Sequence, residues 1–260
     1  MKVSEFVASV ASNVGNDALQ GAIILVAIDR PLDKLIQKSL ALSCHHPGQP
    51  SPWSHTFLLA GPFAGANTPI LDCTVRDKDG NISFKMTLIE IIKTIVDKNG
   101  GVYSSKLCDY DIDAVHPVGV KLIPDATPAE MASIVATGLD LQKKKIHYEF
   151  LGLVRELIAM LTRIRIKPAG PDLFCSAFCQ VCYRAAFGFG PTSRGDFLPA
   201  VDSKDVSPDD IWFSRKGANY PPTANIPIPT FEGLQVKHLP KKATSRRKQA
   251  AKAKPARSGR

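Results

Sequence analysis

No acidic and no aromatic residue occurs in the last 24 positions of the chain, 237–260, although ten of its 33 Lys and Arg residues lie there. Residues 1–236 carry the other 23 basic side chains against 24 acidic ones, so the net charge of +9 belongs to this tail. Because it has few apolar residues to bury, we expect the tail to be disordered. It either keeps the protein soluble or binds an anionic membrane or another polyanion, and without aromatic rings it has no means of base stacking.

Long apolar runs are absent as well. No stretch reaches the roughly 18 apolar residues that span a bilayer, and the polar N-terminus, MKVSEFVASVASNVGNDALQ, has no hydrophobic export core. Six cysteines in a chain without a visible signal favour free thiols in a reducing compartment. We therefore expect a cytoplasmic protein, with export by a signal-independent secretion system as the alternative.

The chain as a whole has the composition of a globular protein, with 44% hydrophobic and 22% charged residues. Short apolar runs predict strands, and helical periodicity with capping residues predicts helices. The strands are expected at 21–28, 54–60, 69–75 and 114–123, and the helices at 31–43, 87–99, 127–145, 148–161 and 173–188, with a short capped turn at 207–214. This mixture predicts an α+β domain over 21–215. Around it we place an N-terminal segment (1–20), a Pro-rich extension (216–236) and the disordered basic tail (237–260).

The stretch FCSAFCQVC, 174–182, has three cysteines with the spacing C-x3-C-x2-C. That spacing matches the one by which radical S-adenosylmethionine enzymes hold an iron–sulfur cluster. Those enzymes carry the motif near the start of a long barrel, whereas only 78 residues follow Cys182 here. Structural zinc is disfavoured because no second ligand pair is apparent. On a helix the three cysteines share one face, and Cys179 and Cys182 then become small core residues.

Cys175 differs from the other two because it lies in the first helical turn, after the breaker Gly170-Pro171 and a possible cap at Asp172. Free amides and the helix dipole at such a position favour a thiolate nucleophile. The candidate base is His55, which lies at the start of a hydrophobic strand. Asp72 lies in the next strand. Neighbouring strands are about 4.8 Å apart, so this carboxylate can orient the imidazole.

The order of these features resembles the circularly permuted branch of the NlpC/P60 papain-like superfamily, the YiiX/YaeF-like cysteine hydrolases related to lecithin:retinol acyltransferases. Four stretches carry the resemblance: GAIILV, WSHTFLL followed by ILDCT, YEF before a helix, and FCSAF followed by SPDDIW. Two departures are Gly21-Ala22, where the family often has Gly-Asp, and a long turn between the His and Asp strands.

The resemblance implies a papain-like fold in which a small antiparallel sheet packs against the nucleophile helix. It implies Cys175 as nucleophile, His55 as base and Asp72 as orienter, and it places Tyr148 near the site. Ser54 and Ser176, beside the base and the nucleophile, are further candidates for substrate binding. No metal or cofactor is expected.

The implied activity is hydrolysis of an amide or ester bond in bacterial envelope material, a cell-wall peptide or a lipid. The alternatives are a lipid acyltransferase or phospholipase of the same fold, or a non-catalytic binding protein that retains it.

Overall fold

The computed structural model describes residues 1–40, 51–77, 79–80, 82, 84, 90, 93, 100–148, 173–188, 197, 206–214 and 216–220. Contacts divide the chain into two units, Met1–Ile228 and Pro229–Arg260, and all described residues belong to the first. The predicted tail, and the helix predicted over 148–161 apart from Tyr148, lie outside the described residues. So does most of the helix predicted over 87–99.

The described residues form a mixed α+β fold around one six-stranded antiparallel sheet with the order β4-β3-β2-β1-β5-β6. The strands are β1 (Ile23–Ile28), β2 (His55–Leu59), β3 (Pro69–Val75), β4 (Gly100–Lys106), β5 (Val115–Leu122) and β6 (Ala218–Tyr220). The helices are α1 (Val3–Val14), η1 (Asp17–Leu19), α2 (Pro31–Leu40), η2 (Leu107–Tyr110), α4 (Pro128–Lys143), α6 (Cys175–Phe187) and α7 (Pro208–Phe213).

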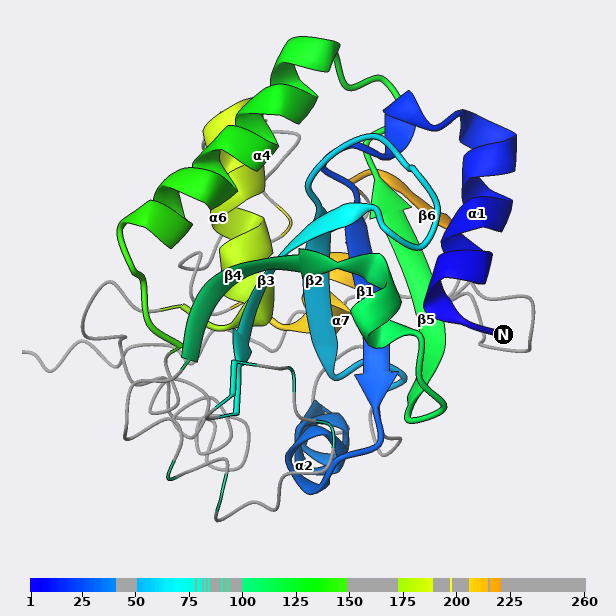
Figure 1. Cartoon of the computed structure of the whole chain (residues 1–260). Coiled ribbons are helices and arrows are strands. Elements are labelled where there is room, and N and C mark those ends of the chain that lie inside the picture. Colours follow the sequence, from blue (N-terminus) through cyan, green and yellow to red (C-terminus); the bar gives the residue numbers. More distant parts are fainter. Residues whose placement is uncertain are drawn as a thin grey trace, which may run out of the picture. The chain divides into compact units, whose positions relative to one another are not determined.

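Helices cover both faces of the sheet (Figure 1). On one face α4, α6 and α7 pack over a core that includes Phe178 and Trp212, and on the other α1 packs over a second core that includes Phe6. The central strand β1 is buried at every position. Its sequence, IILVAI, is apolar without alternation because both of its faces contribute to a core.

Most predicted elements are confirmed, and their ends follow local chemistry. Thr127 caps α4, since its hydroxyl accepts the Glu130 N–H, and Ser207 caps α7 in the same way with Asp210. Helix α6, predicted over 173–188, begins at Cys175, ends at Phe187 and has Gly188 as its C-cap. Its N-cap is Phe174, which makes no side-chain capping bond, while Asp172 lies outside the described residues.

Gly100 and Gly101, which follow the helix predicted over 87–99, begin β4, a strand that was not predicted. They are required there because the 146–148 segment crosses closely. An added Cβ would lie 2.7 Å from the Tyr148 Cβ at Gly100 and 2.6 Å from the Ile146 carbonyl oxygen at Gly101.

Segments placed outside the predicted domain also contribute to this unit. Helix α1 comes from residues 1–20 and buries Phe6, Val7 and Val10 in the second core. Strand β6 comes from the segment expected to be a Pro-rich extension, and it pairs with β5.

Candidate active site

The structure brings His55 and Asp72 together as a buried pair. Strands β2 and β3 are antiparallel with Leu58 opposite Leu71, which puts Asp72 level with Phe57, two residues from His55. The His55 Nε2 atom lies 2.9 Å from Asp72 Oδ1, and the two side chains are 4% and 0% exposed. An ion pair so shielded from solvent is much less screened than a surface pair.

A third side chain, Tyr110 of η2, completes this contact. Its hydroxyl donates to Asp72 Oδ2 over 2.5 Å and lies 3.1 Å from His55 Nε2. The Tyr110 ring stacks on Phe57 at 4.4 Å and on the imidazole at 6.0 Å. Tyr110 was not predicted from the sequence, because it lies in a short turn without a periodic pattern, 38 residues from Asp72 and 55 from His55.

Cys175 lies at the start of α6 and is buried next to the imidazole. Burial alone would lower the pKa of His55. The charges of Asp72 and Cys175, with side-chain hydrogen bonds from both, outweigh it and raise that pKa from 6.5 to about 10. Since Asp72 and Tyr110 share Nε2, Nδ1 is the ring nitrogen left for Cys175. The three residues predicted as nucleophile, base and orienter therefore lie in one contiguous arrangement.

The neighbouring thiols are different in character. Cys179 and Cys182 lie in the core between α6 and the sheet, and burial raises the pKa of both. Cys179 donates to the Thr56 hydroxyl, and Cys73 of β3 donates to the Leu173 carbonyl. These thiols are neutral core groups. Within the described ranges no cluster of three or more His, Cys, Asp or Glu side chains could hold a metal ion.

The predicted substrate-binding residues have three different environments. The Ser54 hydroxyl accepts the Ile28 N–H and donates to Asp33 Oδ1, so it is engaged within the fold. The Ser176 hydroxyl, one residue from Cys175, is buried and has no hydrogen-bond partner among the residues that the structure describes. Tyr148 is half-buried beside Leu173. Burial, and then the charge of Cys175, raise the pKa of Tyr148.

The stretch SPDDI (207–211), which contributed to the resemblance, connects two parts of the fold. Asp209 is fully buried and accepts a hydrogen bond from the Ser51 hydroxyl, which also accepts the Trp53 N–H. Trp53 in turn packs on Trp212 at 4.8 Å. The stretch thereby ties α7 to the segment that leads into His55.

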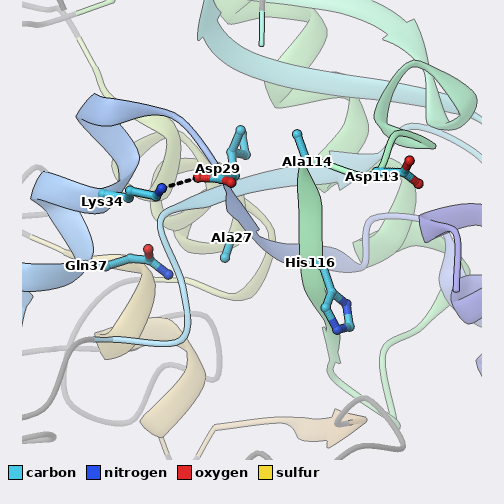
Figure 2. A pocket seen from close by; sticks show the side chains of 8 residues that line it. Ala27, Asp29, Lys34, Gln37, Asp113, Ala114 and His116 are labelled. Carbon is cyan, nitrogen blue, oxygen red and sulfur yellow. Dashed lines mark ion pairs between the residues drawn. The ribbon is translucent and has the colours of Figure 1, made fainter. Parts of the chain in front are cut away.

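A separate groove of about 310 Å³ lies between the end of β1, the first turns of α2 and the start of β5. In Figure 2 the Asp29–Lys34 ion pair stands on one side of it and His116 and Asp113 on the other. The groove contains none of the three residues of the candidate site.

No protein-family model matches the chain, and no curated protein is significantly similar to it. Among the residues that the structure describes, no helix has both the length and the apolar character needed to cross a membrane. The function must therefore be argued from the geometry of the site.

Proposed function

We propose that the protein is a cysteine hydrolase that cleaves an amide or ester bond through a covalent acyl-enzyme. Its main support is the buried Asp72–His55 pair beside a cysteine that begins a helix. Nucleophile, base and orienting acid in contact are the minimum set for thiol-dependent acyl transfer. The papain-like fold of the permuted NlpC/P60 branch is part of the same proposal.

In the first step the Cys175 thiolate attacks the carbonyl carbon of the substrate and an oxyanion forms. His55, protonated in the resting state, gives its proton to the leaving amine or alcohol as the C–N or C–O bond breaks. In the second step water attacks the thioester, His55 takes a proton from that water, and the acid leaves as Cys175 is regenerated. Asp72 holds the imidazole and stabilises its charged form throughout.

The start of α6 supplies the remaining requirement, stabilisation of the oxyanion. The N-cap residue Phe174 makes no side-chain hydrogen bond to the amide groups of the first turn. These amides and the positive end of the helix dipole favour negative charge beside Cys175.

For the substrate we propose bacterial envelope material, either a cell-wall peptide or a lipid. The basic tail, 237–260, would bring the enzyme to such an anionic polymer or surface. An acyltransferase or phospholipase of the same fold differs only in the bond attacked or in the acceptor of the acyl group.

The test is to capture the acyl-enzyme. The protein is incubated with activated esters, with phospholipid and with muropeptide pools, and peptides are analysed by mass spectrometry for an acyl adduct. We expect the adduct on Cys175 and its loss in Cys175→Ala. Cys179→Ala, four residues along the same helix, is the matched control and should retain it. Full hydrolytic activity in Cys175→Ala would end the proposal.

A further inference from the structure

We propose that Tyr110 is a positioning residue of the site, fixing the imidazole of His55 through Asp72 so that its other ring nitrogen faces Cys175. The inference rests on the proposed function and adds a residue to it. It is carried by the closed set of contacts among the three side chains: 2.9 Å from His55 to Asp72, 2.5 Å from Tyr110 to Asp72 and 3.1 Å from Tyr110 to His55.

The need for a second donor follows from the burial of Asp72. This side chain is fully buried, and an unpaired carboxylate oxygen there carries a large desolvation cost. Oδ1 is satisfied by His55 and Oδ2 by the Tyr110 hydroxyl. With both oxygens held, the carboxylate cannot rotate about its own axis without breaking a bond, so the direction it gives to the imidazole is fixed.

Tyr110 also acts on the imidazole directly. Its hydroxyl proton points to Asp72, which leaves the oxygen lone pairs to accept the Nε2–H of His55 together with Asp72 Oδ1. Two acceptors on Nε2 fix its proton there. The Nδ1 atom is thereby directed to the proton that passes between His55 and Cys175.

Tyr110 can hold this place because its own backbone is anchored. The Leu107 N–H donates to the Thr68 carbonyl and the Cys108 N–H to the Ala66 carbonyl, which ties η2 to the turn between β2 and β3. The next residue, Asp111, accepts both the N–H and the hydroxyl of Ser4 in α1. The tyrosine is thus clamped between the β2–β3 hairpin and the N-terminal helix.

The hydroxyl remains a donor over the working range of pH. Burial, and then the charge of Asp72, raise the pKa of Tyr110 well above its usual value, and only Arg30 opposes them among the larger influences. The titratable groups that face it are Asp72, His55, Arg30 and Cys175. Tyr110 therefore positions the pair without taking up the proton of His55.

The experiment is the pH profile of Cys175 alkylation by iodoacetamide, followed peptide by peptide from pH 5.5 to 9 in wild type, Tyr110→Phe and Tyr183→Phe. Tyr183 is the matched control, because it is equally buried and its hydroxyl donates over 2.8 Å to the Gly21 carbonyl, away from the triad. We expect Tyr110→Phe to lower the alkylation rate of Cys175 at pH 6.5 on the order of tenfold, because the imidazole beside the thiol is no longer held in place. Tyr183→Phe should follow wild type.

The outcomes distinguish a failure of the positioning role of Tyr110 from a failure of the proposed function. A Tyr110→Phe profile that coincides with wild type overturns the positioning role and leaves the proposed function intact. If Cys175 in wild type is no more reactive than Cys179 or Cys182, the hydrolase proposal fails, and the positioning role fails with it. Independently of any variant, the Nε2–H proton of His55 should show a nuclear Overhauser effect to the Tyr110 ring. The absence of that effect from an assigned Nε2–H would also overturn the inference.

Discussion

The imidazole of His55 is the residue on which the local chemistry depends. Burial alone would favour its neutral form, yet the charges of Asp72 and Cys175 reverse that preference and raise its pKa to about 10. In the proposed reaction His55 is therefore already protonated and can give this proton to the leaving group, whereas a neutral imidazole would first have to gain one. We therefore expect activity to depend more on His55 than on Asp72.

Removal of His55 should therefore cost far more activity than loosening of its partner. We expect His55→Ala to lower kcat by about 10² to 10⁴-fold, the usual contribution of a general acid–base group. Asp72→Asn keeps the ring in place and should cost less. Steady-state kinetics on an activated ester measures both. Equal losses in the two variants would mean that Asp72 does more than orient the ring.

Three of the site residues could be predicted from the sequence because each has a local pattern. His55 opens an apolar strand, Asp72 lies in the next strand, and Cys175 follows a helix break. The roles of Ser54 and Tyr110 could not be predicted, because the partners Asp33 and Asp72 reach them only through the folding of distant segments. Sequence neighbours of a site residue are thus weaker guides than residues that share its strand face.

At the scale of elements, α1 is the helix that the sequence analysis left out of the domain. Its sequence, VSEFVASVASNV, is rich in small and β-branched residues and has no strong start signal, yet Phe6, Val7 and Val10 are buried against the sheet. Strand β4 was missed for a related reason, since Gly100 and Gly101 are poor strand formers unless another segment must pass close by.

The contact between α1 and η2 predicts an effect on stability. Ser4→Ala removes the hydrogen bond from the Ser4 hydroxyl to Asp111 and keeps the one from the backbone N–H. Because the acceptor is charged, the free energy of unfolding should fall by about 1–3 kcal/mol. Because Asp111 follows Tyr110, activity should decline as well. Urea unfolding and ester hydrolysis measure the two effects.

A second serine of α1 provides the control for this prediction. Ser12 is exposed, and its hydroxyl donates only to the Ala8 carbonyl of its own helix, so Ser12→Ala should change stability by less than about 0.5 kcal/mol. Similar losses in the two variants would show that the Ser4–Asp111 contact contributes nothing beyond helix propensity.

At the scale of the whole molecule the charge is unevenly distributed. The chain up to residue 236 is close to neutral, and the last 24 residues carry ten basic and no acidic side chains. Deletion of 237–260 should leave the melting temperature unchanged within about 2 °C, since few apolar groups are lost. Binding to vesicles containing anionic lipid should weaken and lose its salt dependence. A large drop in melting temperature would mean that the tail packs on the body.

Lys121 and His55 have opposite effects on how the stability of the fold changes with pH. It is fully buried on β5, and its ammonium donates to the Trp212 and Ser214 carbonyls and to the Asn219 amide oxygen. Burial lowers the pKa of Lys121 from 10.5 to about 7. The folded state therefore releases this proton above pH 7, while the unfolded chain holds it to about 10.5, so Lys121 makes stability rise with pH in that window.

The sign for His55 is the reverse. Its pKa of about 10 in the folded state exceeds the unfolded value of 6.5, so its stabilisation is complete below pH 6.5 and is lost as pH rises through about 10. Between pH 7 and 9.5 we expect the free energy of unfolding to fall more steeply in Lys121→Met than in wild type, and to rise in His55→Gln. Urea unfolding at a series of pH values measures the slopes. The other buried thiols and tyrosines are common to both variants, so the difference between the two curves reports these two residues, and parallel curves would contradict both assignments.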